Sequence, residues 1–252
     1  MTDTCSRSTL WQYLWNCGGV AVFFPIYALQ YIKKGPRNDL PVPMADAQAL
    51  PVTGLWSVAM ALPLMIPAFI PDVSPFLIQQ GVVVFFFSFP TLANFQRMTR
   101  FIISALGIQG SKSPIKKVYT MLGSVTALVH IGIVLYTVLN SGEDLTLWRV
   151  YVPNYSAIQR DQPNIMTEAA LFFIQNDYVI INFVVLLLGL HVFSLEPASS
   201  TKRPTGSLTT LVGIMIVFGA GAGLAYVLHS KEDRQDSSSK VFEKDLKLEV
   251  PR

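Results

Sequence analysis

The chain has 252 residues, of which 51% are hydrophobic and 14% are charged, and its net charge is +3. Its mean hydropathy of +0.43 is too high for an ordinary soluble domain, and apolar runs close to the length of a membrane-spanning helix recur along it. These runs are continuous, as in VVVFFFSF and VVLLLGL, which excludes a β-barrel because barrel strands alternate apolar and polar residues.

The hydropathy pattern predicts an all-α, polytopic transmembrane helical bundle with about six spans. Their approximate ranges are 11–32, 50–70, 75–95, 117–140, 168–194 and 207–229. Prolines predict bends in the first three spans, at Pro25, at Pro63 and Pro67, and at Pro90, because proline removes a backbone donor from a helix.

The bundle therefore occupies residues 1–229, and residues 230–252 form a polar tail of mixed charge. Such a composition buries too little apolar surface to order the chain, so we expect this tail to be disordered. GAGAG at 219–223 places Gly219 and Gly223 on one face of the last span, where small residues let helices approach closely.

Basic residues are unequally distributed between the two sides of this arrangement. One side carries Lys33, Lys34, Arg37, Arg97, Arg100, Lys112, Lys116, Lys117, Lys202 and Arg203, and the other side carries Arg7, Arg149 and Arg160. The positive-inside rule makes the first side cytoplasmic, so both chain ends are expected on the lumenal side. The loop 141–167, with LTLWRVYVPNYSAI, is expected to lie along the interface. If it crosses the membrane instead, the count is seven and the tail is cytoplasmic.

The most informative residue is Asp177, within the fifth predicted span ALFFIQNDYVIINFVVLLLGLHVF. A carboxylate near the bilayer centre costs about 2.5–3.5 kcal/mol on insertion scales. Because desolvation disfavours the charged form, we expect a neutral carboxylic acid that can donate a proton. The alternative is a structural hydrogen bond between helices.

Several other polar and aromatic residues fall in the same half of the predicted bundle. The candidate substrate-binding residues among them are Trp15, Asn16, Gln79, Gln80, Tyr136, Asn176 and Tyr226. For Tyr136 and Tyr226, each taken singly, an interfacial aromatic belt is the favoured explanation. Unpaired amides are costly in hydrocarbon, which favours a specific role for Asn16, Gln79 and Gln80.

Sequence motifs of several other reaction classes do not occur. The chain has no glycine-rich phosphate loop, no GxSxG elbow and no aspartate-rich DDxxD segment. An enzyme that ionises a prenyl diphosphate is therefore disfavoured, whereas a proton-initiated reaction of a neutral, lipophilic substrate is compatible with an intramembrane acid.

Three segments, WNCGGVAVFFPIYALQY, LPVPMADAQALPVTGLWSVAMALPLMIPAF and FFIQNDYVIIN, carry a family resemblance. In their order along the chain they resemble the small integral membrane terpene cyclases of fungal meroterpenoid biosynthesis, the ascofuranone-type cyclases in particular. The match to the paspaline and pyripyropene type of cyclase is poorer.

The resemblance implies that a terminal epoxide on a farnesyl chain attached to an aromatic head group is protonated and the cation cyclised. Asp177 would be the acid, and Trp15, Tyr136 and Tyr178 would offer aromatic faces to the cation. The resemblance further implies no cofactor, a prenylated substrate within the lipid bilayer, and residence in the endoplasmic reticulum. The basic residues lie in loops beside the spans, so they indicate topology and not a nucleic acid partner. A non-catalytic membrane scaffold or a small transporter, with Asp177 as a structural partner, is the alternative.

Overall fold

The computed structural model describes residues 10–11, 14–15, 18–34, 44–70, 72–88, 91–107, 114–140, 142, 145–158, 165–194 and 207–249. Over these residues the secondary structure is helical, apart from one isolated bridge between Gly142 and Leu145. The predicted all-α class is therefore confirmed. The chain divides into two compact units, residues 1–118 and 119–252, and each is described by itself.

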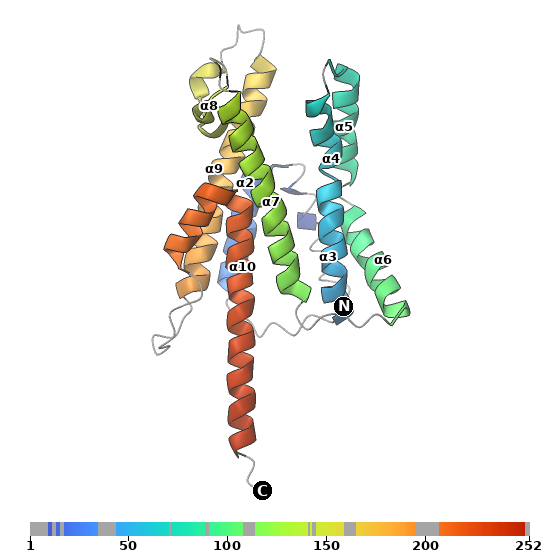
Figure 1. Cartoon of the computed structure of the whole chain (residues 1–252), viewed down its shortest axis with the longest axis vertical. Coiled ribbons are helices and arrows are strands. Elements are labelled where there is room, and N and C mark those ends of the chain that lie inside the picture. The colour runs from blue at the N-terminus through green and yellow to red at the C-terminus, as the bar shows by residue number, and fades with distance from the viewer. Residues whose placement is uncertain are drawn as a thin grey trace. The chain divides into compact units, whose positions relative to one another are not determined.

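Figure 1 labels the helices. Those of the first unit are α2 (Val20–Lys34), α3 (Met44–Ala59), α4 (Leu62–Met65), the 3-10 helix η1 (Ile66–Phe69), α5 (Pro75–Ser88) and α6 (Thr91–Ala105). The helix α7 (Pro114–Leu139) begins at the end of this unit and continues into the second. The second unit also contains α8 (Leu147–Tyr151), the 3-10 helix η2 (Tyr155–Ala157), α9 (Ile165–Ser194) and α10 (Leu208–Glu249).

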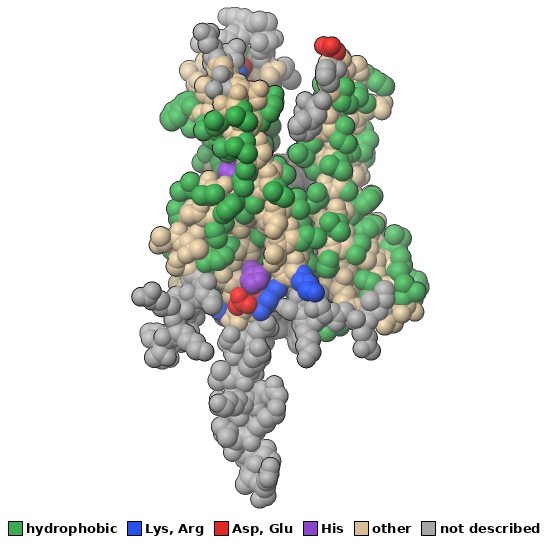
Figure 2. All heavy atoms as spheres, in the orientation of Figure 1, with side chains coloured by type: hydrophobic (Ala, Val, Ile, Leu, Met, Phe, Trp, Pro, Cys, Tyr) green, Lys and Arg blue, Asp and Glu red, His purple; other side chains and the backbone are tan. Residues whose placement is uncertain are grey.

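Four helical segments of the described chain are long and apolar enough to cross a membrane. They are Met44–Met65, Ile115–Leu139, Thr167–Ser194 and Leu208–Arg234, and shorter apolar helices cover Val20–Lys33 and Pro75–Ser88. Hydrophobic side chains dominate the visible surface of both units (Figure 2). Leu139 is 80% exposed and Ile216 is 74% exposed. Such a surface requires lipid as its solvent, as expected for a polytopic membrane protein.

Prolines and a glycine divide the first three predicted spans. A turn at Met60 and Ala61 separates α3 from α4, whose first turn contains Pro63. The helix α5 ends at Ser88 and α6 begins at Thr91, so parts of two helices cover the third predicted span. Gly19 has φ 84°, and α2 begins only after it. The first and third spans are thus shorter helices than the hydropathy pattern predicted.

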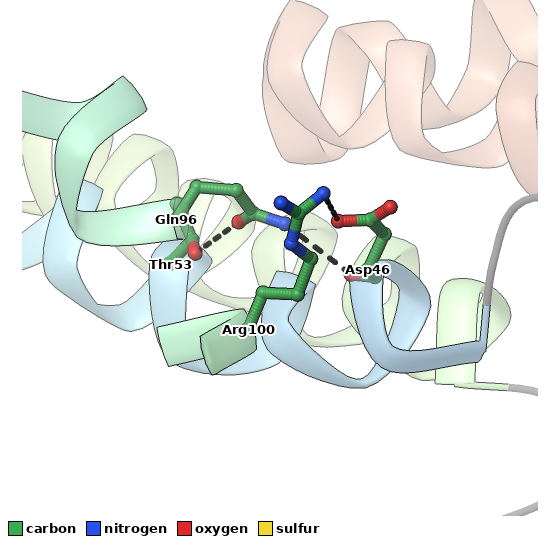
Figure 3. A network of polar contacts seen from close by, with 4 residues as sticks. All are labelled: Asp46, Thr53, Gln96 and Arg100. Atoms are coloured by element: carbon green, nitrogen blue, oxygen red, sulfur yellow. Dashed lines mark hydrogen bonds and ion pairs between the residues drawn. The ribbon is translucent and has the colours of Figure 1, made fainter. Parts of the chain in front are cut away.

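A polar network joins α3 to α6 in the first unit (Figure 3). Arg100 Nη1 lies 3.2 Å from Asp46 Oδ1, and Gln96 Nε2 donates to the backbone oxygen of Asp46 over 3.2 Å. The Thr53 hydroxyl donates to Gln96 Oε1. Asp46, at the start of α3, therefore has a structural role in holding the two helices together.

The helix α10 is folded back on itself at Gly219. This residue has φ 83° and ψ 168°, which are not helical angles. A Cβ atom built on Gly223 would lie only 3.3 Å from Leu211 Cδ1. In a straight helix the two residues would be separated by about 18 Å along the axis. The segment is therefore a helical hairpin with a first arm, residues 208–218, and a second arm, residues 220–249; Figure 1 shows them as an orange arm that meets a red arm.

The first arm packs between α9 and the second arm. Leu211 is fully buried, and a Cβ on Gly189 of α9 would lie 2.2 Å from Leu211 Cδ2 and 3.4 Å from Val227 Cγ2. Glycine at position 189 thus leaves the space that the Leu211 side chain fills.

The second arm runs antiparallel to α7. Built Cβ atoms on Gly219 and Gly221 meet His130 and Thr126, and one on Gly123 meets Ala225, so rising numbers on α10 accompany falling numbers on α7. Because the first arm is only about 16 Å long, it cannot cross a hydrocarbon core of about 30 Å. The two ends of the hairpin point the same way, unlike those of a single crossing over 207–229.

Candidate functional site

An aromatic cluster forms where three helices of the second unit meet. It consists of His130 from α7, Tyr151 from α8 and Tyr178 from α9, with ring centroids 5.7 Å apart for His130 and Tyr151 and 5.1 Å apart for Tyr151 and Tyr178. The rings of His130 and Tyr178 are nearly parallel, with centroids 6.5 Å apart. The Tyr151 hydroxyl lies 3.4 Å from His130 Nδ1. The tip of the α10 hairpin, Gly219, packs against His130, where a Cβ would lie 2.9 Å from Cγ.

The short helix α8 positions Tyr151. Its N-cap is Thr146, whose side chain accepts a hydrogen bond of 3.1 Å from the backbone N–H of Arg149. Burial, and secondly the neighbouring Tyr178, raise the pKa of Tyr151 above its usual value of 10.0. Tyr151 is therefore a neutral hydroxyl that can donate or accept a hydrogen bond.

A pocket of about 100 Å³ lies between α8 and the first turns of α9. It is lined by Thr146, Trp148, Arg149, Val152, Asn154, Glu168, Leu171 and Gln175. Arg149 Nη2 pairs with Glu168 Oε1 at 2.5 Å, and the Gln175 side-chain amide donates to the backbone oxygen of Arg149. The short helix α8 thus meets α9 at two places. Arg149 meets it at the pocket, and Tyr151 meets it at the aromatic cluster.

Asp177 lies in α9 between Gln175 and Tyr178 in sequence, and at about 3.6 residues per turn it points away from the side of the helix that bears those two residues. It is partly buried and follows Gln175 by two residues, which is about 3 Å along the helix axis. It directly precedes Tyr178 of the aromatic cluster, and it interacts with other residues of the structure. Asn176 donates its side-chain amide to the backbone oxygen of Phe172 over 2.8 Å, within its own helix.

The remaining predicted residues of the second unit lie elsewhere. Tyr136 in α7 is 61% exposed, which suits the interfacial aromatic belt. Tyr226 lies in the second arm of α10, edge-on to Phe193 with centroids 6.1 Å apart. Of the predicted aromatic residues in this unit, Tyr178 is the one that joins the cluster with His130 and Tyr151.

The other predicted residues belong to the first unit. Trp15 packs edge-on against Phe24 and Tyr27, and its Nε1 is buried with no acceptor among the described residues. Gln79 and Gln80 are exposed on α5. Asn16 lies outside the described residues.

Sequence reasoning missed the contacts that α8 makes. From the sequence, Arg149 marks only the topology, and Glu168 and His130 are not among the predicted site residues. One signal was present: Glu168, Gln175 and Tyr178 are spaced by seven and three residues, which places them on one side of a helix. That polar stripe marks the side of α9 that α8 covers.

Comparisons with known proteins bear on the whole chain. The family model described as the CtvD domain matches residues 2–234. This family is associated with meroterpenoid and terpene cyclase biosynthesis. Comparisons with curated proteins and with solved structures gave no match. Within the described part of the chain, no three His, Cys, Asp or Glu side chains are grouped so that they could hold a metal ion.

Proposed function

Because the chain belongs to the CtvD domain family, we propose that it is a membrane-bound terpene cyclase of meroterpenoid biosynthesis. The family supports a biosynthetic, cyclase-type role. The proposed reaction is protonation of a terminal epoxide on a farnesylated aromatic substrate, followed by cyclisation of the cation. The observation that carries the proposal is an acid, Asp177, inside the apolar segment Thr167–Ser194 and next in sequence to Tyr178.

Each step of this reaction balances in protons and electrons. The Asp177 carboxylic acid transfers its proton to the epoxide oxygen as one carbon–oxygen bond breaks and a hydroxyl group forms. The cation on carbon is captured by the π electrons of an alkene or by an oxygen, which closes a ring. Loss of a proton from the final cation returns the proton to the carboxylate. The substrate is isomerised and no co-reactant is consumed.

The aromatic side chains of α8 and α9 suit a cationic intermediate. Tyr178 and Tyr151 offer aromatic faces, and the negative face of an aromatic ring attracts a cation, most strongly where water is excluded. A dry site also prevents water from capturing the cation before ring closure. The proposed reaction therefore requires that the substrate reach Asp177 from the bilayer.

The alternative is a scaffold or a small transporter in which Asp177 is only a structural hydrogen-bond partner. Its interactions within the structure are compatible with that role. The two proposals differ in one measurable respect, because only the cyclase requires the proton of Asp177.

The test is product formation in microsomes that contain the protein and are supplied with a farnesylated aromatic epoxide. We expect the wild type to form cyclised product and Asp177→Asn to lose activity by a factor of about 10² or more. Asp233→Asn is the matched control, because Asp233 pairs with His229 at 3.2 Å on α10, away from the aromatic cluster. Equal turnover by Asp177→Asn at equal expression would remove Asp177 from the mechanism, and no product from the wild type would refute the cyclase proposal.

A further inference from the structure

We propose that the pocket between α8 and α9 binds the polar head of the substrate, and that it selects a ring bearing a free hydroxyl group. This inference rests on the proposed function for the nature of the prenyl chain. Its own support comes from Gln175 and from Arg149, which both line the pocket.

Gln175 supplies a hydrogen-bond acceptor that is not used within the described chain. The residue is only 3% exposed, yet it lines the pocket. Its amide N–H group is bound to the backbone oxygen of Arg149, which determines the orientation of the amide. Its Oε1 has no donor among the described residues. A nearly buried acceptor beside a pocket is matched by a ligand that donates a hydrogen bond, such as a hydroxyl group.

Arg149 supplies hydrogen-bond donors to the same pocket. One of its nitrogens, Nη2, is paired with Glu168, and a guanidinium group has five N–H donors in all. Because Glu168 balances the charge of Arg149, the pocket favours a neutral polar group over a strong anion. A hydroxyl group can satisfy both residues at once, by donating to Gln175 and accepting from Arg149.

The walls and size of the pocket suit one edge of a ring. Trp148, Val152 and Leu171 provide apolar surface beside the polar groups. The volume of about 100 Å³ is smaller than the roughly 150 Å³ of an engineered cavity that binds benzene. The pocket can therefore enclose the substituted edge of a ring, while the prenyl chain must remain outside it.

The test compares two ligands that cannot react. Dissociation constants are measured by calorimetry on the purified full-length protein in detergent, for a farnesylated phenol without an epoxide and for its methyl ether. The ether removes the donor and leaves Gln175 Oε1 facing an ether, so we expect it to bind about tenfold to a hundredfold more weakly than the phenol.

Two variants separate this proposal from the proposed reaction. In Gln175→Met the ratio of the dissociation constants of the two ligands should fall to about one. The same variant controls for unequal partitioning of the ligands into micelles, because partitioning does not depend on residue 175. Asp177→Asn should leave the ratio unchanged, whatever its effect on turnover.

The proposal is overturned if the wild type binds both ligands equally, binds neither, or if the ratio persists in Gln175→Met. Should Gln175→Met fail to fold, Leu171→Phe, which fills the pocket, must weaken the binding of both ligands at least tenfold. If turnover is lost but the wild-type ratio of the two dissociation constants is kept, the head-group site is supported. That result bears only on the proposed cyclase reaction.

Discussion

The substitution Gly219→Ala tests the hairpin of α10 directly. Position 219 has φ 83°, a backbone conformation that costs a residue with a side chain about 1–3 kcal/mol. The new methyl group would also lie 2.9 Å from His130 Cγ, and overpacking of this kind costs about 1–3 kcal/mol. We therefore expect a loss of about 2–6 kcal/mol in the free energy of unfolding.

Gly213→Ala is the matched control in the same helix. A Cβ at position 213 meets nothing within 4 Å, and alanine in a helix interior is favoured over glycine by about 1 kcal/mol. Unfolding of both variants can be followed by circular dichroism during titration with SDS. If Gly219→Ala were as stable as Gly213→Ala, the backbone turn at Gly219 and the hairpin deduced from it would be refuted.

Two further predictions concern topology and pH. Because the hairpin begins and ends on the same side, glycan acceptor sites placed within positions 195–206 and after Glu249 should be modified alike, and oppositely to one placed within positions 141–164. Unlike modification of the first two would contradict the hairpin. Tyr151 has a raised pKa in the folded state, so the unfolded chain ionises it first and its contribution to stability is lost as pH rises above 10.0. Tyr151→Phe should reduce this alkaline loss in melting experiments between pH 9 and pH 11, roughly the range in which tyrosine titrates, and an unchanged profile would show that Tyr151 does not cause it.

The membrane class of the protein follows from its sequence because hydropathy is a local property. A long apolar segment must satisfy its backbone groups internally in lipid, so it becomes a helix wherever it packs. The same argument singles out Asp177, because the cost of a carboxylate in such a segment depends on its immediate surroundings in the chain. The structure confirms the predicted helix that contains Asp177, which covers Thr167–Ser194.

The residues that share a site with one another depend on packing between helices. His130, Tyr151 and Tyr178 come from three separate helices, and no spacing along the chain relates them. Gln175 and Arg149 likewise meet only because α8 lies against α9. Side-chain contacts between helices follow from how the helices cross, which local patterns do not encode.

The hairpin of α10 shows most clearly which features follow from local sequence and which follow from packing between helices. Its composition is that of a single membrane span, and the length and hydropathy of Leu208–Arg234 fit a crossing helix. Glycines alone do not decide the outcome, because glycine is common in straight transmembrane helices that pack closely. The fold is decided by Leu211, which is buried between Gly189 and Gly223 only when the chain reverses at Gly219. The sequence by itself determined that this segment is an apolar helix, and tertiary packing determined that it turns back, because the energy of that turn lies in contacts between residues that a straight helix would hold apart.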